Sequence, residues 1–115
     1  MSKNAPVPRP LPEPLIEFVA QRFRVLGEPM RIKLLDRLRE GDATVGELKE
    51  ALGASQQNVS KHLGILHAAG MVARTKDGNH SRYSISDPSV FELCDQVCGG
   101  VRRQLQELET MLQPS

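Results

Sequence analysis

The chain has 115 residues and a formal net charge of +1, from 15 lysines and arginines against 14 acidic residues. This length predicts one small domain. A net charge so close to zero does not by itself point to any class of partner. Aromatic residues make up only 3% of the chain, which argues against sheets that bind nucleic acid by stacking bases on aromatic side chains. We therefore expect a thin core of packed aliphatic helices and an oligomer that buries further surface.

The sequence predicts a cytoplasmic protein with no membrane partner. No stretch approaches the roughly 20 apolar residues that span a bilayer. The N-terminus lacks the basic and apolar pattern of a signal peptide. Cys94 and Cys98 do not make a disulfide framework, so we expect both to remain thiols in a reducing compartment.

Residues 1–14 are rich in proline, with a proline at every second position from Pro6 to Pro14. Alternating prolines block helix formation and remove the donors that a sheet needs, so a flexible, extended tail is predicted. Three roles stay open for this tail: a spacer, an arm that docks a protein partner, or an arm that touches the DNA backbone through Lys3 or Arg9.

Two helices are predicted after the tail. Apolar residues at helical spacing run from Leu15 to Gly27. Pro29 suits the first turn of a second helix, where its missing N–H has no cost. We expect this second helix to run to Gly41 as its C-terminal cap.

The next two segments have the pattern of a helix-turn-helix. Thr44 opens a capping box of the form S/T-x-x-E, and Gly53 ends the short helix that follows. Ser55 is a suitable cap for the second helix, predicted at about 55–69, and Gly70 closes it. Two short helices joined by a tight turn that contains glycine are typical of this motif.

A β-hairpin is predicted directly after the helix-turn-helix, over about 71–86. Asp77-Gly78 between two strand-like runs is a strong hairpin signal. A helix-turn-helix followed by a hairpin makes a winged helix. The predicted fold is thus mainly α with a small β-hairpin, a winged helix-turn-helix domain over 15–112.

The last predicted helix covers about 88–112 and carries a long apolar stripe at spacings of three and four residues. So small a domain cannot bury all of it, and we interpret the helix as a dimerisation element. Gly99 and Gly100 interrupt it at a cost that close approach to a partner helix would offset. The predicted homodimer interface comprises Leu15, Phe18, Val97, Val101, Leu105 and Leu108.

The second helix of the motif carries the hypothesis of DNA binding. Its apolar stripe leaves amides, hydroxyls and one cation facing outward, and such groups bind base edges and phosphates. The alternative for this helix is an ordinary solvated face that binds nothing. The alternative for the wing is that its charges only protect the edge strand from aggregation. The predicted DNA contacts are Ser55, Gln56, Gln57, Asn58, Ser60, Lys61, partly His62, and in the wing Arg74, Lys76, His80 and Arg82, with the last two favoured near the tip.

The sequence contains few features that are typical of an enzyme. The sequence has no glycine-rich phosphate loop and no nucleophile elbow, and its three histidines have no evident partners. We predict that the chain is not an enzyme.

The sequence resembles the ArsR/SmtB family of bacterial winged-helix repressors. The resemblance is carried by Leu26–Leu38, by Val45–Val72 and by Ala73–Ile85, and above all by the S-x-x-x-V-S-x-H-L-x-x-L core from Ser55 to Leu66. It implies a homodimer on a pseudo-palindromic operator of double-stranded DNA, which represses transcription until an inducer releases it.

The inducer sites known in this family do not match. The cysteines of the arsenic-sensing and lead-sensing motif are absent from Glu47–Leu52, and only Asp87 matches among the four ligands of the zinc-sensing site. Cys94 and Cys98, one helical turn apart, leave open a thiol switch that binds a soft metal or metalloid or responds to oxidants or sulfur species. Alternatively, Cys94 and Cys98 are simply small buried apolar residues with no sensing role. A weaker alternative is that the whole protein is a non-sensing dimeric adaptor.

The near-zero net charge conceals an uneven distribution. Residues 55–86 hold four basic side chains against one acidic, and residues 87–115 hold two basic against five acidic. The surplus of positive charge in residues 55–86 lies on the predicted DNA face. A surplus of three charges is modest, so we expect DNA binding that depends on base contacts and weakens readily with salt.

Overall fold

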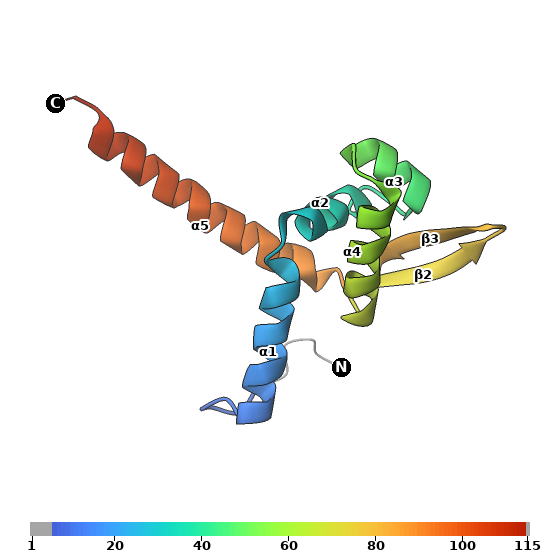
Figure 1. The fold of residues 1–115 in the computed structure, drawn as a ribbon. Helices are drawn as coiled ribbons and strands as arrows, with labels where there is room; N and C mark the ends of the chain where they lie inside the picture. The colour runs from blue at the N-terminus through green and yellow to red at the C-terminus, as the bar shows by residue number, and fades with distance from the viewer. Residues whose placement is uncertain (1–5, 115) are drawn as a thin grey trace. The chain divides into compact units, whose positions relative to one another are not determined.

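The computed structural model describes residues 6–114, and its elements follow the predicted order of a winged helix-turn-helix (Figure 1). The chain divides into two compact units, one ending at Ile85 and one beginning at Ser86. The elements are α1 (Glu13–Leu26), α2 (Pro29–Leu38), β1 (Ala43–Thr44), α3 (Val45–Leu52), α4 (Gln56–Ala68), β2 (Val72–Asp77), β3 (His80–Ile85) and α5 (Ser89–Leu112). The predicted fold class is confirmed.

The first unit is built around α2, which contacts α1, α3, α4 and β3. Its core is aliphatic, as the low aromatic content predicts, and Tyr83 is the aromatic side chain that it buries among the described residues. The largest fully buried side chains are Leu34, Leu35, Leu48, Val59, Leu63, Leu66 and Met71. No described helix is both long and apolar enough to cross a membrane.

The sheet has three antiparallel strands in the order β1-β3-β2, one more than the predicted hairpin. β1 is only two residues long, too short for sequence periodicity to reveal, and its Thr44 pairs with Arg82 of β3. The hairpin turn also lies one residue later than predicted. Asp77 pairs with His80, and Gly78, at φ 63°, occupies the turn.

Local sequence signals explain most of the helix ends. Thr44 Oγ1 accepts from the Glu47 N–H at 3.2 Å, and Glu47 Oε1 accepts from the Thr44 N–H at 2.9 Å, so the predicted capping box is formed. Gly53 and Gly70 adopt the left-handed conformation at φ 61° and 75°. The prediction for Gly41 is wrong, because α2 ends at Leu38 and is capped by the next residue.

The helix α1 begins at Glu13, inside the predicted tail, because a proline fits the first turn of a helix as well as an extended segment. Residues 6–12 form neither helix nor strand. The first five residues of the tail, including Lys3, lie outside the described part of the chain.

The helix α5 runs without a break through Gly99 and Gly100 over its 24 residues. Its apolar stripe is exposed: Val97, Val101, Leu105 and Leu108 each keep about half of their surface or more in contact with solvent. Of the α1 residues in the predicted interface, Phe18 is 73% exposed and Leu15 is half-buried. An exposed apolar stripe of this length is typical of a helix that packs against another.

Candidate nucleic-acid interface

The helix α4 is held rigidly by a cap at its start and by burial of one side. Ser55 Oγ accepts from the Asn58 N–H at 3.1 Å, which satisfies one of the free donors of the first turn. Val59, Leu63 and Leu66 are completely buried, at relative exposures of 0%. The orientation of the opposite side of the helix is thereby determined.

The opposite side of α4 is the candidate recognition face. Four predicted residues are exposed there: Gln56, Gln57, Ser60 and Lys61. Gly64 and His67 are exposed as well, one and two turns further along, and sequence reasoning missed both. Gly64 lies four residues after Ser60 and His67 three residues after Gly64, and this helical spacing is the signal that would have identified them. Ser55 is exposed at the cap, whereas Asn58 is half-buried and lies nearer the core side.

His62 departs from the prediction that it partly faces DNA. The residue is only 6% exposed, and Arg31 Nη1 lies 3.1 Å from its Nδ1. At about 100° per residue, His62 lies on the side of α4 opposite Ser60. The expectation was wrong because an imidazole can enter a core when another element supplies a hydrogen-bond partner.

The wing presents basic side chains on both faces of the hairpin. Arg74 and Lys76 alternate with Thr75 along β2, so they share one face, and all three are exposed. His80 is exposed beside the turn. Their exposure leaves the side chains of Arg74, Lys76 and His80 accessible to phosphate groups.

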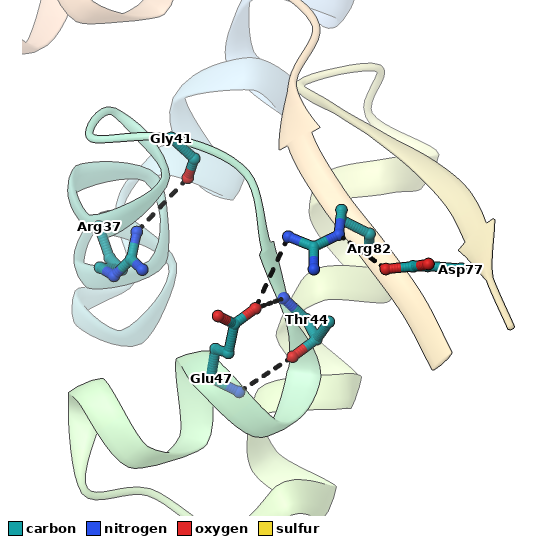
Figure 2. Close-up of polar contacts among 6 residues, drawn as sticks. All are labelled: Arg37, Gly41, Thr44, Glu47, Asp77 and Arg82. Carbon is teal, nitrogen blue, oxygen red and sulfur yellow. Dashed lines mark hydrogen bonds and ion pairs between the residues drawn. The ribbon is translucent and has the colours of Figure 1, made fainter. Parts of the chain in front are cut away.

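Arg82 is held by two carboxylates of its own chain (Figure 2). Its Nε donates to Asp77 Oδ2 at 3.2 Å, and its Nη1 lies 3.7 Å from Glu47 Oε1. Arg82 is the third residue of β3, two residues after His80, and does not lie at the tip of the hairpin. The hydrogen bond to Asp77 raises the pKa of Arg82 above its ordinary value, so the guanidinium stays charged.

Glu47 joins the wing to the start of α3. Hydrogen bonds from Thr44, first from its backbone, lower the pKa of the Glu47 carboxyl, and the charges of Arg82 and Arg37 act in the same direction. Figure 2 shows this carboxylate between Thr44 and Arg82, with Arg37 bonded to the Gly41 carbonyl nearby. The cluster fixes the hairpin against the first helix of the motif.

The two cysteines lie on α5, one turn apart. Cys98 is exposed and Cys94 is half-buried. Over residues 6–114, no cluster of three or more histidine, cysteine or acidic side chains is arranged to hold a metal ion. One described chain therefore supplies two soft ligands at most at this place, fewer than the four that zinc prefers.

Comparison with known proteins gives one consistent result. A family model described as "Bacterial regulatory protein, arsR family" matches residues 28–74. The HTH-type transcriptional regulator Rv0081 of Mycobacterium tuberculosis is 44% identical over 82 residues, which cover 70% of this chain and 72% of that protein. Its crystal structure superposes with a TM-score of 0.75 at 39% identity, covering 84% of this chain and 97% of the other.

Two further likenesses agree. A probable mercury resistance operon repressor of Streptomyces lividans is 43% identical over 74 residues, 64% of this chain and 59% of that protein. The homodimeric winged helix-turn-helix DNA-binding domain Mb0332 of Mycobacterium bovis superposes with a TM-score of 0.73 at 23% identity, covering 87% and 95%. The likeness to Mb0332, at 23% identity, supports the fold alone.

Proposed function

Because the chain belongs to the ArsR family of bacterial transcriptional regulators, we propose that it is a homodimeric repressor that reads operator DNA with α4 and the wing. One observation carries this proposal: a capped, half-buried helix presents two exposed glutamines, a serine and a lysine on one face. The chain is a transcriptional regulator rather than an enzyme.

The residues of the recognition face have the chemistry of base readout. A glutamine amide can donate to and accept from adenine in the major groove, and a lysine can bind guanine or a phosphate. Gln56, Gln57, Ser60 and Lys61 lie in the first half of α4, and N-terminal residues of a recognition helix are those that reach base edges. Gly64 allows close approach of the helix backbone, because it has no side chain.

The wing supplies contacts that add affinity without sequence information. Arg74, Lys76 and His80 are exposed and suit phosphates or the adjacent minor groove. Arg82 is engaged with Asp77 and Glu47. Its first role in this proposal is to hold the hairpin in place, and a DNA contact requires exchange of a carboxylate for a phosphate.

A dimer matches the proposed DNA target. The exposed stripe of α5, from Val97 to Leu108, needs a partner surface, and a second copy of the chain offers an identical one. Two recognition helices related by a two-fold axis read two half-sites about 34–36 Å apart, so a pseudo-palindromic operator follows.

Fluorescence anisotropy tests the proposal with two duplexes of equal length: the DNA upstream of the protein's own gene, and a scrambled sequence. We expect tighter, salt-sensitive binding to the first. Gln57→Ala should weaken that binding about tenfold and leave the scrambled duplex unaffected. Gln106→Ala, an exposed glutamine on the polar side of α5, is the matched control. Equal affinity for the two duplexes would contradict the proposal.

A second candidate function is a thiol switch at Cys94 and Cys98, favoured by the exposure of Cys98 one turn from a second thiol. At about 100° per residue, Cys94 lies within the apolar stripe and Cys98 at its border. Modification of the sulfurs, or a soft metal or metalloid bound by thiolates of two protomers, would thus act on the dimer surface. Release from DNA by arsenite, persulfide or peroxide should disappear in Cys94→Ser/Cys98→Ser. Unchanged release would eliminate this switch.

A further inference from the structure

The side chain of Arg31, on α2, joins three helices of the first unit. Its Nε donates to the Val25 carbonyl of α1 at 2.6 Å, and its Nη2 donates to the Arg24 carbonyl at 3.3 Å. Its Nη1 lies 3.1 Å from Nδ1 of His62 on α4. One guanidinium therefore caps the last turn of α1, where the Arg24 carbonyl also accepts from the Gly27 N–H at 3.3 Å, and reaches the recognition helix.

The contact with His62 has a defined direction. A guanidinium has only donors, so in a hydrogen bond with Arg31 it is Nδ1 of His62 that accepts. Glu28 holds the backbone beside this contact: its Oε2 accepts from the Arg31 backbone N–H at 3.2 Å and lies 3.8 Å from Nδ1 of His62, beyond hydrogen-bond distance. Charge-assisted bonds of this kind are stronger and more directional than neutral ones.

His62 is the point at which this network acts on the recognition face. It lies on the side of α4 opposite Ser60 and Gln57, at about 100° per residue. Since α4 is a rigid body, a rotation or shift at His62 moves those two side chains with it. Among the described residues, no buried side-chain nitrogen or oxygen lacks a partner, and Arg31 Nη1 is the group that lies within hydrogen-bond distance of Nδ1 of His62.

The other end of the network lies on α1, where Phe18 and Phe23 are 73% and 54% exposed. Exposed aromatic side chains on an amphipathic helix mark a surface for a partner. Arg31 binds the final turn of the same helix. A change in the last turn of α1 is thus connected through Arg31 to α4 by hydrogen bonds.

We propose that Arg31 is a positioning residue for DNA recognition: through His62 it sets the orientation of α4 and couples that orientation to α1. The part concerning DNA rests on the function proposed above. The part concerning coupling between the helices does not depend on it.

Four full-length variants separate positioning from charge. Arg31→Lys keeps the charge but reaches only one of the three acceptors, and Arg31→Met removes charge and donors together. His62→Phe fills the site without an acceptor, and His62→Asn restores an acceptor close to the position of Nδ1. Lys33→Met, an exposed residue on the same helix, is the control for the loss of one positive charge.

The first readout is the ratio of affinities for the promoter duplex and the scrambled duplex. We expect Arg31→Lys, Arg31→Met and His62→Phe to lower this ratio about fivefold or more, and His62→Asn and Lys33→Met to change it less than about twofold. Simple destabilisation lowers both affinities together and leaves the ratio intact. An unchanged ratio in folded Arg31→Lys and His62→Phe would overturn the positioning role.

The second readout is amide hydrogen exchange without DNA. His62→Phe, a change in α4, should speed exchange in the last turn of α1 about fivefold or more, whereas His62→Asn and Lys33→Met should not. Exchange in α1 that does not respond to His62→Phe would overturn the coupling. If the wild-type protein does not distinguish the duplexes, the proposed function fails, and the exchange result still decides the coupling.

Discussion

The guanidinium of Arg82 on β3 lies 3.7 Å from the carboxylate of Glu47 on α3, so one ion pair connects the wing to the helix-turn-helix. The same carboxylate closes the capping box with Thr44. The wing's position and the start of α3 are thus coupled through one acidic side chain.

Glu47→Gln should make stability less dependent on pH. Folding lowers the pKa of Glu47 below its ordinary value near 4.5. The charged carboxylate therefore stabilises the fold at pH values above that, and this contribution is lost as the pH falls through the folded-state pKa. Glutamine can still accept the bond from Thr44, so the change removes the charge alone.

We expect the wild type to resist urea better than Glu47→Gln at pH 7, and the difference to be smaller at a second pH below 4.5. Glu50→Gln, exposed on the same helix, is the matched control and should show a smaller change with pH. Identical differences at both pH values would contradict the role of the Glu47 charge.

Ser55→Ala should destabilise the protein by about 1 kcal/mol, because the Asn58 N–H loses its acceptor. Ser55→Asp restores an acceptor and should recover most of the loss. The free energy of unfolding in urea, measured for both variants, checks the prediction. Equal destabilisation by the two substitutions would show that the hydroxyl does not act as a cap.

Gly64→Ala and Gly70→Ala should change stability in opposite directions. Gly64 lies inside α4 with no atom within 4 Å of an added Cβ, so alanine should stabilise the helix by about 0.5–1 kcal/mol. Gly70 has φ +75°, where an L side chain is strained, and alanine should destabilise by about 1 kcal/mol or more.

The added methyl group of Gly64→Ala also tests the recognition face. Because Gly64 is exposed on that face, we expect weaker binding to the promoter duplex despite the higher stability. Thermal unfolding and anisotropy on the same sample separate the two effects. A variant that is more stable and binds as well as the wild type would remove Gly64 from the interface.

Lys61→Met should reduce the salt dependence of DNA binding. If Lys61 binds a phosphate, the slope of log affinity against log salt should fall by about 1, for promoter and scrambled duplexes alike. Lys33→Met serves as the control and should leave the slope unchanged. A loss of affinity for the promoter duplex alone would instead indicate that Lys61 contacts a base.

Leu105→Glu should weaken the dimer. Leu105 is 58% exposed in the single chain, within the apolar stripe of α5, and a carboxylate there would be buried without a partner in a dimer. We expect sedimentation equilibrium to show a dimer for the wild type and monomer for the variant at micromolar concentration. Gln106→Glu, on the polar side of α5, should leave the dimer intact.

Apart from β1, the start of α1 and the end of α2, the order of the elements, the winged fold and the helix caps follow from the sequence by itself. Thr44 with Glu47, Ser55 and Gly70 act on backbone groups within a few residues of themselves, so their pattern alone predicts where helices begin and end. The recognition face follows from the spacing of Val59, Leu63 and Leu66 in the same way.

Only the tertiary structure decided what the polar side chains of that scaffold do. His62 enters the core because Arg31, 31 residues earlier, supplies a donor. Arg82 is held by Glu47, and β1 forms because two residues meet β3. Such pairs join segments far apart in the chain, and their formation depends on distances that exist only after the helices and the hairpin have packed.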